Sequence, residues 1–229
     1  MTRRRRRDNP HYLEIPDAAN QLRTWTSNRD SALINVKGSF RERGKARDVA
    51  ASMVAIIQTN KCPVIWALSP RSGNTGQLSS LDILKYLTLQ ILQVNKSHLR
   101  DGAKPLSAVK FQCARTDSEW FELLGESLVG LSEIYIVLDI ETFRSDTGNG
   151  RAWSTAFIKL FETLAAQNPR IVVKVAIISY HTQLESVPLD ITKQNVMQLN
   201  IRTKETRQKV GRNKDLRLKL GMRSRRQVC

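Results

Sequence analysis

Cysteine is scarce in this sequence, and its spacing excludes two common kinds of site. Cys62, Cys113 and Cys229 lie far apart and form no CxxC pair, so neither a disulfide framework nor a cysteine zinc site is predicted. The three histidines have no metal-ligand spacing with one another or with cysteine. No GxSxG motif is present, so a serine hydrolase of that class is excluded. We therefore expect a reduced, intracellular protein.

Long apolar runs are also absent, and aromatic residues are few. No window approaches 18 uninterrupted apolar residues, so no membrane-spanning helix is predicted. The basic run near the N-terminus is not followed by the apolar segment that a secretory signal needs. These absences predict a cytoplasmic or nuclear protein with no membrane partner. Aromatic residues make up 6% of the chain, and the four tryptophans fall on apolar faces, which predicts core packing rather than stacking on bases.

Positive charge is abundant, and it is concentrated at the two ends of the chain. The 229 residues include 37 Lys and Arg against 21 Asp and Glu, a formal net charge of +16. Arg3–Arg7 supply +5 and residues 202–229 a further +9, which leaves only +2 for residues 8–201. The sequence therefore predicts a disordered basic arm at 1–12, a domain at 13–201 and a flexible basic tail beyond it.

The basic ends suggest an anionic partner. Arg3–Arg7 and the tail at 202–226 can contact the phosphates of a nucleic acid without reading its sequence. For Arg3–Arg7 the alternative is a solubilising or nuclear-localisation segment. The charge distribution thus leaves nucleic-acid binding as one candidate function and assigns it to the ends rather than to the body.

The body alternates short apolar runs with helical patterns. Five runs rich in Val and Ile have the length of buried strands: 32–36, 63–68, 134–138, 171–178 and 196–201. Four amphipathic stretches lie between them: 46–59, 81–94, 120–131 and 153–164. Residues 97–116 and 142–150 are predicted loops. This alternation predicts an α/β fold, a three-layer doubly wound parallel sheet of about five strands.

The segment after the first strand has the context of a phosphate-binding loop. A P-loop reads GxxxxGK[ST], in which backbone amides and Lys hold phosphates and the hydroxyl holds magnesium. Here Gly44 and Lys45 are in place, but Ser39 stands at the first glycine position and Ala46 at the hydroxyl position. The candidate nucleotide-binding residues are Gly38, Ser39, Arg43, Gly44, Lys45 and Ala46.

Two further strand ends carry polar candidates. The apolar run 134–138 ends at Asp139, as in a Walker B strand whose carboxylate holds magnesium, and Glu141 follows two residues later. Ser179 follows the fourth strand, where a sensor residue would meet a γ-phosphate. The alternatives are a carboxylate that caps a turn and an ordinary polar loop at 179–181.

The order of these segments resembles the NACHT-like P-loop NTPases of fungi, which belong to the STAND class of signal-transduction ATPases. The resemblance covers residues 13–201 and is carried by 22–25, 31–38, Gly44-Lys45, 63–68, 81–87, 120–124, 134–139 and 173–179. It implies a strand order of 5-1-4-3-2, which would place Asp139 near the loop after the first strand. It also implies ATP or ADP with Mg²⁺ as cofactor, and a nucleotide state that gates oligomerisation or an attached effector.

The catalytic motifs depart from the family pattern. Family P-loops read GxPGxGK[ST], and their Walker B strand continues to an acidic pair where Thr142 and Phe143 stand here. These degenerate Walker A and Walker B motifs predict a non-hydrolysing regulatory or protein-interaction module with at most weak nucleotide binding. Its partner would be another protein or a second copy of the chain. The alternatives are an active ATPase of the signal-transduction class and a nucleic-acid-binding protein.

Overall fold

The computed structural model describes residues 16–39, 41, 43–68, 78–95, 108–140, 150–167, 170–180 and 196–201. The predicted disordered arm at 1–12 and the tail at 202–229 lie outside these residues, as do Glu141, Thr142 and Phe143. All five predicted strands fall within the described part of the body.

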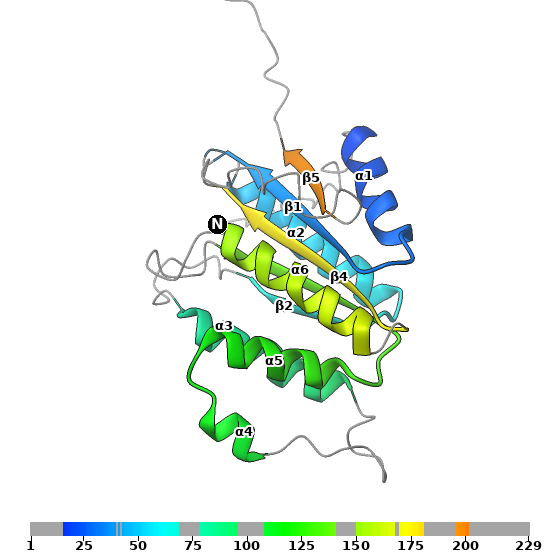
Figure 1. Cartoon of the computed structure of the whole chain (residues 1–229). Coiled ribbons are helices and arrows are strands. Elements are labelled where there is room, and N and C mark those ends of the chain that lie inside the picture. The colour runs from blue at the N-terminus through cyan, green and yellow to red at the C-terminus, as the bar shows by residue number, and fades with distance from the viewer. Residues whose placement is uncertain are drawn as a thin grey trace, which may run out of the picture.

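The centre of the body is a five-stranded parallel sheet (Figure 1). Its strands are β1 (Ala32–Gly38), β2 (Val64–Ala67), β3 (Glu133–Asp139), β4 (Val172–Ser179) and β5 (Val196–Ile201). They are arranged in the order β2-β3-β4-β1-β5, which is 5-1-4-3-2 when taken from the other edge. The strand order implied by the family resemblance is therefore confirmed, together with the predicted parallel sheet.

Helices cover both faces of the sheet, so the predicted three-layer architecture is confirmed (Figure 1). The helices are α1 (Pro16–Ser27), α2 (Arg43–Thr59), α3 (Ser80–Val94), α4 (Ala108–Cys113), α5 (Asp117–Leu128) and α6 (Gly150–Gln167). Helices α1 and α2 pack on one face, and α3, α5 and α6 pack on the other. The short helix α4 lies inside the predicted loop at 97–116, so that loop prediction is wrong for 108–113; its six residues were too few to show a periodic pattern.

Side-chain alternation along the strands explains why both faces are buried. On β3, Ile134, Ile136 and Leu138 join the core beneath α3, α5 and α6, whereas Tyr135 and Val137 join the core beneath α1 and α2. Strands with apolar residues on both faces require helices on both sides. Among the described helices, none combines the length and the apolar character that crossing a membrane requires.

Two helices start where their sequences supply complete capping boxes. Ser79 caps α3 and exchanges hydrogen bonds with Asp82, and Thr116 caps α5 in the same way with Glu119. Each box satisfies backbone N–H groups that have no partner within the helix. Local capping residues thus determine where α3 and α5 begin, and with them the position of the helical layer on that face.

At the amino ends of the strands, buried polar contacts connect the sheet to the segment that leads into β1. The Trp25 ring nitrogen donates to the carbonyl oxygen of Ala32 at 3.1 Å. The Lys174 ammonium is completely buried and donates to the carbonyl oxygens of Asn28 and Asp30 at 2.6 Å each. Burial lowers the pKa of Lys174 from its ordinary value. These contacts hold the lead-in segment against β1 and β4.

Candidate functional site

The carboxyl ends of β1, β3 and β4 meet at one edge of the sheet. There β4 lies between the other two strands, with Lys37 of β1 opposite Ser179 and Asp139 of β3 opposite Ile178. Ligands of open α/β sheets bind beyond this edge, in the crevice between the strand ends and the following helices. The structure therefore brings together the three predicted groups: the end of β1, Asp139 and Ser179.

The candidate phosphate-binding residues surround the start of α2. This helix begins at Arg43, so Gly44 and Lys45 lie in its first turn, where backbone N–H groups have no partner within the helix. Arg43 and Gly44 are exposed and Lys45 is half-buried. The first turn of α2 thus carries Arg43 and Lys45 and no acidic residue, at the positive end of the helix dipole; we call this turn the basic corner.

Ala46 takes part in packing instead of facing this corner. It is completely buried in the core beneath α2, and a Cβ atom added to Gly38 would lie 3.5 Å from the Ala46 Cβ atom. This is an ordinary van der Waals distance, so the first turn of α2 packs against the end of β1. The position where a P-loop carries its metal-binding hydroxyl is therefore part of an apolar packing contact.

Asp139 is held by two other side chains at the same edge. It is 1% exposed, and its Oδ2 atom accepts a hydrogen bond from the Tyr180 hydroxyl at 2.7 Å. The Arg47 Nε atom lies 3.7 Å from the same oxygen, and the Arg47 guanidinium carbon lies 5.8 Å from the centroid of the Tyr180 ring. We call these three residues the Asp139 cluster.

Tyr180 is the hydrogen-bond donor in the Asp139 cluster. Burial raises the pKa of Tyr180 well above its ordinary value, and the charge of Asp139 and its hydrogen bond raise it further. The tyrosine therefore stays protonated and donates, while the guanidinium supplies the compensating positive charge. The cluster also connects three elements, since Arg47 lies on α2, Asp139 ends β3 and Tyr180 follows β4.

This donor set does not fit a magnesium ion. Mg²⁺ requires oxygen ligands in a near-octahedral shell that keeps several waters. Asp139 is instead buried beside a guanidinium, with a hydroxyl donating to its Oδ2 atom, and Ala46 has no side-chain oxygen. Within the described ranges, no group of three or more His, Cys, Asp or Glu residues comes together as a metal site.

Ser179, the predicted sensor, lies at this edge as the last residue of β4. Its side chain is 2% exposed, and the residue after it donates the tyrosine hydrogen bond to Asp139. Sequence reasoning missed Tyr180 and Arg47 as members of the site. Their positions gave one signal, since each directly adjoins a motif residue: Tyr180 follows Ser179, and Arg47 follows Ala46.

No protein-family model matches this chain, and no curated protein is significantly similar to it. The resemblance to NACHT-like P-loop NTPases therefore stays a prediction. Of what it implies, the structure shows the strand order.

Proposed function

We propose that the chain is a degenerate NACHT-like P-loop domain that does not hydrolyse nucleotides and works as a regulatory or protein-interaction module. The observation that carries this proposal is the Asp139 cluster. The carboxylate that would hold magnesium accepts a hydrogen bond from Tyr180 and lies beside Arg47. A second argument comes from Ala46, which replaces the metal-binding hydroxyl and is buried in the core.

The energetic cost of these replacements is large for a hydrolase. Removing one preorganised group that stabilises a transition state costs about 3–4 kcal/mol in well-studied enzymes. Here the hydroxyl is missing at Ala46 and the acidic strand end is engaged by protein groups. Two such losses together slow hydrolysis by about 10⁴–10⁶-fold.

The cluster also suggests what has taken the place of the nucleotide. In a nucleotide-gated domain the ligand and its metal connect the first helix to the ends of the central strands, so their loss changes the arrangement. Here Arg47 and Tyr180 make that connection to Asp139 with protein side chains. The domain is accordingly held in one arrangement whatever the nucleotide concentration, as suits a constitutive scaffold for a protein partner or a second copy.

Weak anion binding remains compatible with this function. Arg43, Lys45 and the first turn of α2 present positive charge at the carboxyl edge. This corner attracts the phosphates of ATP or ADP without needing Mg²⁺. Nucleic-acid binding is the alternative; it would depend on Arg3–Arg7 and residues 202–226, because residues 8–201 carry a net charge of only +2.

Phosphate release from ATP by the full chain tests the absence of hydrolysis. We expect the wild type, Lys45→Ala and Asp139→Asn to share one background rate in the presence of Mg²⁺, because none of them assembles a catalytic metal site. A wild-type rate above that background, falling roughly 100-fold in either variant, would show an active ATPase and overturn the proposal.

A further inference from the structure

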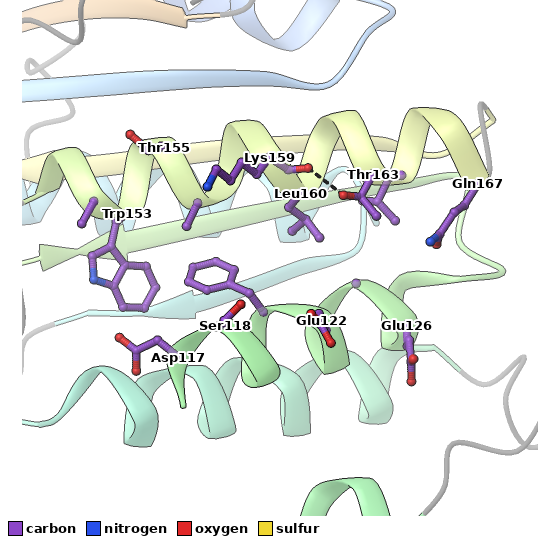
Figure 2. A pocket seen from close by; sticks show the side chains of 15 residues that line it. Asp117, Ser118, Glu122, Glu126, Trp153, Thr155, Lys159, Leu160, Thr163 and Gln167 are labelled. Carbon is purple, nitrogen blue, oxygen red and sulfur yellow. Dashed lines mark hydrogen bonds between the residues drawn. The ribbon is translucent and has the colours of Figure 1, made fainter. Parts of the chain in front are cut away.

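A cavity lies between α5 and α6, on the face of the sheet that these helices cover (Figure 2). It is an open groove of ≈ 960 Å³ whose two walls are these helices. The core beneath α3, α5 and α6 is separate from the core beneath α1 and α2, where Ala46 lies, so the groove is distinct from the Asp139 cluster. Binding of a ligand in this groove therefore does not depend on whether a nucleotide binds at the carboxyl ends of the strands.

The floor of the groove is apolar and ordered by aromatic contacts. The Phe121 ring meets Trp153 and Phe157 edge-on, with centroid distances of 5.4 Å and 5.3 Å. Gly125 faces Leu160 so closely that an added Cβ atom would lie 2.9 Å from the Leu160 Cδ1 atom. The two helices therefore touch at the bottom of the groove, and apolar side chains of a ligand can be buried above that contact.

The α5 wall is acidic in a strongly basic protein. Helix α5 has four carboxylates and no Lys or Arg, and three of these carboxylates, Asp117, Glu122 and Glu126, line the groove (Figure 2). The one basic side chain among the described lining residues is Lys159 on α6. Ser80 donates to Asp117 at 2.8 Å, and Lys110 pairs with Glu126, whereas Glu122 is exposed. The groove therefore combines an apolar floor with an acidic wall, which suits a ligand that carries apolar side chains and cations.

We propose that residues 202–229 of the same chain dock in this groove. That segment has eleven Lys and Arg residues and two acids, the charge that complements α5. Its apolar residues gather at Leu216, Leu218 and Leu220, and they alternate with Arg217 and Lys219. The leucines match the apolar floor, and the interleaved cations match the carboxylates of the α5 wall.

The connection is long enough for docking within one molecule. β5 ends at Ile201 at the carboxyl edge of the sheet, and α5 and α6 both start at that edge because each leads back to the amino end of the next strand. From β5 to β3 there are three strand spacings, about 15 Å. The stretch from Ile201 to Leu216 spans up to about 50 Å when extended. Tethering also gives the segment an effective concentration on the order of millimolar, so modest contacts suffice.

Zero-length carbodiimide coupling of the full chain, followed by peptide mapping, locates the docked segment. We expect Lys214 and Lys219 to couple mainly to Glu122 and its neighbours on the α5 wall, and rarely to Glu162, an exposed carboxylate of α6 outside the groove. Coupling should fall at about 1 M salt, where the Debye length is about 3 Å. Coupling spread evenly over Glu162 and the groove would overturn the proposal.

A matched pair of charge reversals gives an independent readout. The rate of trypsin cleavage within 202–229 should rise several-fold in Glu122→Lys and stay at the wild-type value in Glu162→Lys, because both sites are exposed but only the first lines the groove. Equal rates in all three proteins would contradict docking. Coupling of a mixture of isotopically light and heavy chains identifies the occupant: groove products that join only different copies would also overturn docking within one chain.

Discussion

At the scale of single residues, Tyr180 decides what Asp139 can do. An acidic strand end in a parallel sheet is a metal ligand only if its oxygens face the ligand side with room for water. The Tyr180 hydroxyl donates to Asp139 at 2.7 Å, and the Arg47 Nε atom lies 3.7 Å from the same oxygen. One tyrosine and one arginine therefore make this acidic strand end an internal connection between α2, β3 and the end of β4.

Replacing Tyr180 by Phe should lower the free energy of unfolding by about 1.5–3 kcal/mol, because a buried carboxylate loses a hydrogen bond to its charged oxygen. Chemical denaturation of the full chain measures this loss. Tyr86→Phe is the control, since Tyr86 is 47% exposed on α3 and should change stability by less than about 0.5 kcal/mol. Equal, small effects of the two variants would show that the Asp139 cluster contributes nothing to stability.

At the scale of elements, the short strand β2 is protected by the helix beside it. β2 forms one edge of the sheet, and the outward N–H and C=O groups of Trp66 need partners. The Gln90 side chain of α3 supplies both: its Oε1 atom accepts from the Trp66 N–H at 3.1 Å, and its Nε2 atom donates to the Trp66 carbonyl oxygen at 2.9 Å. The Gln90 side-chain amide thus makes the two hydrogen bonds to Trp66 that a further strand would otherwise make.

Gln90→Ala should expose this edge. We expect a loss of about 1–2 kcal/mol in the free energy of unfolding from two part-buried hydrogen bonds, together with concentration-dependent self-association seen by light scattering. The control is Gln93→Ala, at an exposed position of the same helix. Equal stability and equal monodispersity of the two variants would show that Gln90 does not protect this edge.

At the scale of the whole molecule, the sequence was sufficient for the fold and insufficient for the site. Apolar runs such as 134–138 have strand length, and amphipathic stretches separate them, so the layers follow from local patterns. The candidate residues Gly38, Asp139 and Ser179 do meet at one edge, because parallel strands place their carboxyl ends together. Local patterns therefore located these strand-end residues correctly.

The partners of the site residues could not be predicted in the same way. The contact of Tyr180 with Asp139 joins positions 41 residues apart, and it depends on the side-chain direction at the first residue after β4. The burial of Ala46 depends on how closely the first turn of α2 approaches Gly38. Such contacts are set by three-dimensional packing. Motif spacing therefore showed which candidate residues were present, but not which of them contact other protein side chains.

Titration calorimetry of the full chain with ATP, with and without Mg²⁺, asks whether Asp139 holds a metal or only its protein partners. Because Arg47 and Tyr180 engage Asp139, we predict that ATP binds weakly, with a Kd of about 1 mM or above, and that Mg²⁺ and Asp139→Asn leave this value unchanged. Binding at about 1 μM that requires Mg²⁺ and is lost in Asp139→Asn would contradict the degenerate P-loop domain proposed for this chain, because the carboxylate would then serve a metal ion.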